Sequence, residues 1–135
     1  RKAALHGDDR RTRADRIVPY AVFTDPQVAG VGLSERRARD RGVEHEVASL
    51  PFSRIARAAE TDRSAGVVRV LVDPSSDRVL GASIVGAEAA ELIHFFSLLM
   101  QAEAPARVLV DAEMVHPAFA EGMQTAVMQL ERHAL

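Results

Sequence analysis

The sequence predicts an α+β fold, in which an antiparallel β-sheet has helices packed on one face. Segments with strand character come mostly before segments with helical periodicity, the order expected of this class. Two apolar, β-rich segments, 67–72 (VVRVLV) and 79–85 (VLGASIV), flank the turn-forming stretch 73–77 (DPSSD), which predicts an antiparallel hairpin. A chain of 135 residues that is 47% hydrophobic is sufficient for one core.

The segment 20–24 (YAVFT) is aromatic and β-branched, which predicts the first strand. It ends before Pro26, because proline cannot donate to a β-ladder. Gly30 and Gly32 follow, and we interpret them as a turn. They lack the third glycine and the parallel βαβ setting of a dinucleotide-binding loop, so no nucleotide site is predicted there.

A short surface helix is predicted after Ser34, whose hydroxyl can accept from free N–H groups, and Gly42 supplies its end. The next segment, 43–50 (VEHEVASL), predicts a strand that ends near Pro51.

Three helices are predicted in the second half of the chain. Apolar residues in 88–101 recur at helical spacing, so this helix should pack on the sheet. A short helix is predicted at 106–110. The last helix should begin at Pro117, because proline suits the first helical turn. The two apolar stripes are Leu92, Phe95, Phe96 and Leu99, and then Phe119, Met123, Val127, Leu130 and Ala134.

Composition excludes several classes of function. A formal net charge of −2 gives no general attraction for nucleic acid or anionic membranes, so neither partner is expected. No apolar run approaches the roughly 20 residues that span a bilayer, and a cytoplasmic protein is expected. The chain has no cysteine, which excludes disulfides, thiolate nucleophiles and Cys-ligated zinc within it.

The segment 114–123 (MVHPAFAEGM) contains the most specific chemistry, with His116 and Glu121 five positions apart. If a helix begins at Pro117, His116 occupies the N-cap and both side chains can meet. A carboxylate that accepts a hydrogen bond from one nitrogen of a histidine ring fixes the tautomer of the ring. It also makes the other nitrogen a better proton acceptor, as in a general base. The alternative is that both residues only cap a helix and contact solvent.

The other candidate residues favour structural roles. His94 is predicted to be a packing or surface residue, since no second ligand stands at metal spacing. Arg54 and Arg57 are expected in a solvated loop between strands, with an anion site as the lesser alternative. Gly122 interrupts a helix, which indicates close approach by another backbone at an interface.

Three motifs together resemble one known family. The segments VPYAVFTDPQVAGVGLSE, RVLGASIVGAEAAELIH and HPAFAE are similar, in this order, to the C-terminal dimerisation domain of the FAD-dependent pyridine nucleotide-disulfide oxidoreductases. This group includes dihydrolipoamide dehydrogenase, glutathione reductase and mercuric reductase. The resemblance implies the dimerisation-domain fold of FAD/NAD-linked reductases for residues 17–135. It also implies that residues 1–16, which are polar, form a linker or the tail of an upstream FAD domain.

The resemblance further implies a function for the pair. In this family the His-Pro-x-x-x-Glu segment supplies a catalytic histidine and its glutamate partner, which match His116 and Glu121. His116 and Pro117 would contact the FAD of the partner subunit in a homodimer, where the histidine exchanges protons with a redox-active cysteine pair. FAD and NAD(P)H would bind to other domains of the same polypeptide, and this fragment alone is expected to bind neither and to be inactive.

Two positions depart from the family pattern. Met114 stands where some branches carry another histidine, and Ala118 where threonine or serine is common. The segment VFTDPQVAGVG looks close to mercuric-reductase-like proteins, yet the chain lacks the terminal cysteine pair of those enzymes, so the substrate stays open.

Two alternatives to this function stay open at the level of sequence. One is a free-standing dimerisation or ligand-binding module without catalysis. The other is a metal site formed by His116 and Glu121 with His133 or His45, although no metal is expected.

Overall fold

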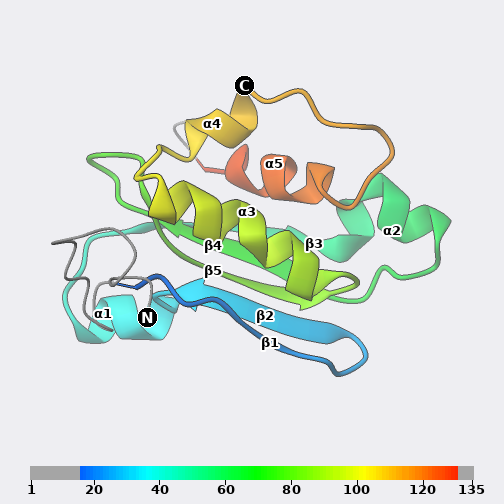
Figure 1. The fold of residues 1–135 in the computed structure, drawn as a ribbon, viewed down its shortest axis with the longest axis horizontal. Helices are drawn as coiled ribbons and strands as arrows, with labels where there is room; N and C mark the ends of the chain where they lie inside the picture. Colours follow the sequence, from blue (N-terminus) through cyan, green and yellow to red (C-terminus); the bar gives the residue numbers. More distant parts are fainter. Residues whose placement is uncertain (1–15, 131–135) are drawn as a thin grey trace, which may run out of the picture.

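The computed structural model describes residues 16–130, which form a five-stranded sheet with helices against it (Figure 1). All pairings are antiparallel, in the spatial order β1-β2-β5-β4-β3, so the predicted α+β fold is confirmed. The strands are β1 Tyr20–Val22, β2 Gln27–Gly32, β3 Glu46–Pro51, β4 Val67–Val72 and β5 Val79–Gly86. Within the described residues, no helix is both long and apolar enough to cross a bilayer.

Two helices form a layer on one face of the sheet. Helix α3 contacts β1, β2 and β5, while α5 contacts β3 and β4 (Figure 1). The helices are α1 Glu35–Asp40, the 3-10 helix η3 Phe52–Arg54, α2 Ala56–Glu60, α3 Ala89–Gln101, α4 Arg107–Val110 and α5 Glu121–Val127. The predicted helices at 88–101 and 106–110 are therefore confirmed to within one residue at each end.

The core lies between the sheet and this helical layer. Alternation along the strands places Val68, Val70 and Ile84 on the covered face, where they are fully buried with Phe96 of α3. Arg69 points to the opposite face and pairs there with Glu35 of α1. Helix α1 thus lies apart from the layer formed by α3 and α5.

The predicted hairpin is present as β4 and β5, joined by the turn 73–77. The Asp73 carboxylate accepts hydrogen bonds from the hydroxyl and the backbone N–H of Ser75, both at 2.7 Å. These bonds lower the pKa of Asp73 to about 2. The caps of α1 are also as predicted, because the Ser34 side chain accepts from the N–H of Arg37 and Gly42 has a φ of +63°.

The interpretation of Gly30 and Gly32 as a turn is wrong, because both residues belong to strand β2. A Cβ on Gly30 would lie 2.6 Å from the hydroxyl of Tyr20 on the neighbouring strand. Gly30 therefore makes room for an aromatic ring within the sheet. Gly32, with a φ of +69°, ends the strand before α1.

The prediction of a loop around Arg54 and Arg57 is also wrong. These residues lie in η3 and α2, and Arg57 pairs with Glu60 at 3.3 Å. Three alanines in the segment ARAAE favour a helix, and burial of Ala58 fixes it on the core. This pairing engages Arg57 and gives no support to the anion site.

Candidate active site

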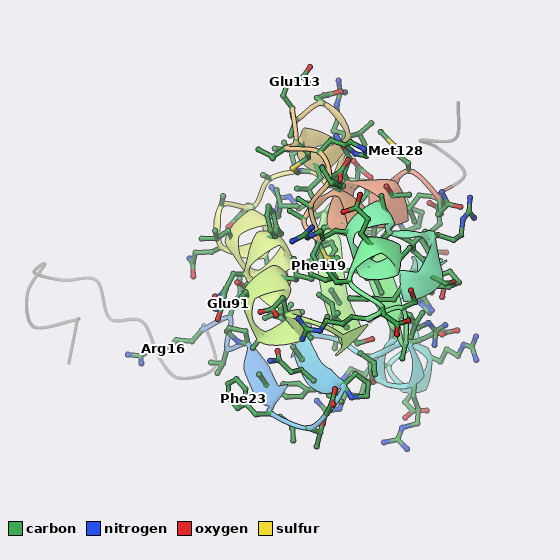
Figure 2. The ribbon with its side chains drawn as sticks, turned by 90° about the vertical axis from the view of Figure 1, so that its right-hand side faces the viewer. Arg16, Phe23, Glu91, Glu113, Phe119 and Met128 are labelled. Atoms are coloured by element: carbon green, nitrogen blue, oxygen red, sulfur yellow. The ribbon has the colours of Figure 1, made fainter. Side chains whose placement is uncertain are left out.

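The predicted site lies in the loop formed by residues 111–120, between α4 and α5. The loop runs along the outside of the helical layer towards α2 and then enters α5 (Figure 1). Glu113 stands at one end of the molecule, whereas Phe119 lies nearer its middle (Figure 2). The side chain of His116 is 70% exposed.

His116 and Glu121 meet directly. Nδ1 of His116 lies 2.7 Å from Oε1 of Glu121, whose side chain is 23% exposed. A carboxylate can only accept, so Nδ1 carries the proton and Nε2 is the nitrogen open to a reacting group. The pair can hold and transfer a proton at Nε2 while Glu121 balances the charge of a protonated ring.

The helix start predicted from Pro117 is wrong. Helix α5 begins at Glu121, and the bonds from Gly122 N–H to the Phe119 carbonyl and from Met123 N–H to the Ala120 carbonyl form its first turn. The His116-Pro117 peptide bond is cis, and Pro117 lies in the loop. The predicted contact between His116 and Glu121 therefore arises from a turn of the loop.

The second oxygen of Glu121 organises this turn. Oε2 accepts a hydrogen bond from the N–H of Ala118 at 2.8 Å. This bond, followed by the bond from His116, lowers the pKa of Glu121. A glutamate that reaches back three residues to a free N–H is one half of a capping box, whose other half is a serine or threonine hydroxyl. Ala118 occupies that position here.

Substituting Ala118→Ser should complete the capping box. We expect the free energy of unfolding to rise by about 1 kcal/mol, because the new hydroxyl can accept from the N–H of Glu121. Urea denaturation at pH 7 measures the change, and Ala102→Ser, at an exposed position at the end of α3, is the control. A decrease in stability for Ala118→Ser would show that the turn has no room for the reciprocal bond.

Glu121→Gln should reduce the stability of the chain in a pH-dependent way. The pKa of Glu121 in the folded chain lies below its usual 4.5, so the carboxylate stabilises fully above about pH 4.5 and this contribution is lost as pH falls through the folded value. The amide of the variant still accepts from Ala118 but carries no charge. Urea denaturation should therefore show a gap between the two proteins at pH 7 that narrows at pH 3. A gap of constant size would contradict the assigned interactions.

Phe119 anchors the loop, a role that the sequence does not predict. Its ring centroid lies 6.3 Å from that of the fully buried Phe52, and the guanidinium of Arg63 stands 5.9 Å above the ring. Arg63 in turn pairs with Glu88 at 2.8 Å. Gly86 leaves room for Phe52, because a Cβ there would lie 2.4 Å from its ring. The spacing of Phe119 along a helical stripe indicated burial but could not identify these partners.

The remaining candidates are not brought to the site. His45 contacts the carbonyl of Val43, and His94 is exposed on α3, as predicted for a surface residue. His133 and Ala134 lie outside the described residues, and the part of the chain that the structure describes contains no group of three metal-ligating side chains. The neighbour that Gly122 accommodates is the side chain of Ile55 rather than another backbone, since a Cβ on Gly122 would lie 2.3 Å from its Cδ1.

The site lies on an open surface. Two cavities lie beside α1, both lined by Ser34, Arg36 and Ser83, and neither includes His116. His116 and Pro117 are both exposed.

Comparison with known proteins identifies the fold as that of a described family. Residues 18–127 match the family "Pyridine nucleotide-disulphide oxidoreductase, dimerisation domain". The chain is 35% identical over 120 residues to "Probable pyridine nucleotide-disulfide oxidoreductase RclA" of Escherichia coli, covering 88% of this chain and 27% of that protein. It is 40% identical over 120 residues to a dihydrolipoyl dehydrogenase of Haloferax volcanii, covering 89% of this chain and 24% of the relative.

Solved structures agree with this assignment. The HOCl-induced flavoprotein disulfide reductase RclA of E. coli superposes with a TM-score of 0.84 and 33% identity, over 93% of this chain and 29% of that one. LpdA of Mycobacterium tuberculosis gives a TM-score of 0.77 with 26% identity, over 82% of this chain and 24% of that one. The chain spans about a quarter of the length of these relatives. It belongs to the dimerisation-domain family of the pyridine nucleotide-disulphide oxidoreductases.

Proposed function

We propose that this chain is the C-terminal dimerisation domain of a flavoprotein NAD(P)H-dependent disulfide oxidoreductase. His116 and Glu121 serve as an acid/base pair for the cysteine thiols beside the flavin of the partner subunit. The observation that carries this proposal is the 2.7 Å contact between an exposed histidine and a carboxylate that is fixed by a second hydrogen bond. The longer polypeptide that carries this domain is called the parent flavoprotein below.

The chemistry follows from the reactivity of thiols. A thiolate attacks a disulfide, whereas a thiol does not, so a base that removes the thiol proton sets the rate of exchange. Nε2 of His116 accepts that proton, and Glu121 stabilises the resulting imidazolium through Nδ1. As the new S–S bond forms and the old one breaks, the imidazolium gives this proton to the thiolate that leaves. Disulfides and dithiols are the substrate class that this chemistry serves.

The open position of His116 supports action across a subunit interface. The 135-residue chain contains no cysteine, so a thiol that reacts at His116 must come from another part of the polypeptide, another subunit or the substrate. When bound to the parent flavoprotein, FAD supplies the electrons that it receives from NAD(P)H. His116 and Pro117 would contact its edge from the partner subunit.

Experiments on the isolated chain test whether this domain dimerises by itself and lacks flavin binding and turnover. We expect sedimentation to show a dimer near 29 kDa, twice the 14.7 kDa of one chain. The same preparation, mixed with FAD, NADPH or NADH and a disulfide, should retain no flavin after gel filtration and show no oxidation of the nucleotide. Turnover by the isolated chain would contradict the proposal, and a strict monomer at all concentrations would contradict autonomous dimerisation.

A further inference from the structure

The loop that carries His116 is fixed mainly at its two ends. Among the described residues, no backbone hydrogen bond involves positions 113–117. Val115 is 80% exposed and His116 is 70% exposed, so neither is held by packing, whereas Met114 is partly buried and packs against the core. The position of the imidazole therefore depends on Met114 and on how each end of the loop is attached.

One helix supplies both attachments. Glu121 holds the end of the loop through the N–H of Ala118. One turn further along α5, the Nε2 group of Gln124 donates to the carbonyls of Leu109, Val110 and Ala112, at 2.9, 3.2 and 2.7 Å. Residues three apart on a helix lie on the same side, so the two clamping side chains stand together.

The side chain of Gln124 is matched to its surroundings. The three carbonyls lie at the end of α4 and the start of the loop, where helix carbonyls lack the partners of a continuing helix, although the Leu109 carbonyl also accepts from the N–H of Ala112 at 3.4 Å. Only a donor can satisfy them, which fixes the amide with its nitrogen towards the loop. The side chain is partly buried, so competition from water is reduced.

We infer that Gln124 is a positioning residue that holds the start of the 111–120 loop and thereby keeps His116 on Glu121. Its place in catalysis rests on the proposed function, whereas its effect on the loop does not. Gln124 holds the loop by donating hydrogen bonds, and not by the space that its side chain fills.

Three variants of the 135-residue chain distinguish these roles. Gln124→Met keeps the length of the side chain and removes the donor. Gln124→Lys restores donation, since an ammonium group has three N–H donors for three carbonyls. Gln129→Met is the control, because Gln129 is exposed near the end of α5 and donates to the Thr125 carbonyl rather than to the loop.

The measured quantity is the pKa of the Glu121 carboxyl, obtained by ¹³C NMR during a pH titration. The hydrogen bonds from Ala118 and His116 lower this pKa in the native chain, and release of the loop would move both residues away from Glu121. We expect Gln124→Met to raise the pKa towards 4.5 and Gln129→Met to leave it near the native value. In Gln124→Lys the pKa should lie at or below the native value, because the ammonium group also stands beside the carboxylate, so turnover decides whether donation is restored. If Gln124→Met fails to fold, Gln124→Asn replaces it, with an amide too short to reach all three carbonyls.

An unchanged pKa in Gln124→Met would overturn the inference, as would an equal rise in the Met and Lys variants. In the parent flavoprotein, Gln124→Met should lower kcat several-fold with little change in KM, and Gln124→Lys should recover most of the loss. If His116→Ala left turnover intact, the proposed function would fail while the titration of Glu121 still decided the role of Gln124.

Discussion

His116→Ala should lower turnover of the parent flavoprotein by a factor of about 10² to 10⁴, the usual contribution of a positioned acid/base group. The flavin should remain bound, because His116 is an exposed loop residue and encloses no cofactor. The loss is expected because the substitution removes Nε2, the nitrogen proposed to take the proton from the attacking thiol. Steady-state assays measure turnover, and the flavin absorbance spectrum of the same sample measures the amount of bound flavin.

His45→Ala is the matched control for this substitution. His45 contacts the carbonyl of Val43 through Nδ1 and lies outside the 111–120 loop. Turnover of this variant should stay near that of the unmodified enzyme. Near-normal turnover of His116→Ala would refute the acid/base role, whatever the control shows.

Phe52→Ala should combine a large loss of stability with damage to the site. Phe52 is fully buried, and truncation of a buried phenylalanine costs about 3–5 kcal/mol of unfolding free energy. It also removes the partner of Phe119, so the loop should move relative to Glu121. Urea denaturation gives the first effect, and the Glu121 titration or turnover at a temperature where the protein stays folded gives the second.

Phe96→Ala separates the two effects of the previous substitution. Phe96 is equally buried but lies on α3, and no ring contact joins it to Phe119. We expect a similar loss of stability with an unchanged pKa of Glu121. If both variants altered the pKa to the same extent, the effect would be a general consequence of instability rather than loss of the Phe52–Phe119 contact.

Local patterns predicted much of the fold because each depends on a few neighbouring residues. Turn residues located the hairpin, and Ser34 with Gly42 located the first helix. Strand β2 escaped prediction because its glycines resemble a turn, whereas Gly30 accommodates Tyr20 from the adjacent strand. Such a contact depends on strand pairing, which a local pattern does not show.

The sequence predicted the two residues of the site, His116 and Glu121, but not the contacts that hold their loop in place. The spacing of His116 and Glu121 indicated a contact, and that contact exists. The start of α5 was misplaced because Pro117 suits both a helix and a loop, and the N–H of Ala118 is satisfied by a side chain. Phe52 comes from a distant part of the chain, and the carbonyls held by Gln124 are brought to it by the return of the chain through the loop, so both contacts require the tertiary fold.

Mixed dimers of the parent flavoprotein test most directly whether His116 acts on the partner subunit. One subunit carries His116→Ala, and the other has its flavin-side cysteine pair replaced by serine. In a twofold dimer, action across the interface leaves one complete site, formed by the cysteines of the first subunit and the histidine of the second. Mixed dimers purified by two different tags should therefore be active, although the homodimer of each variant has almost no activity. Mixed dimers as inactive as the two homodimers would contradict action across the interface.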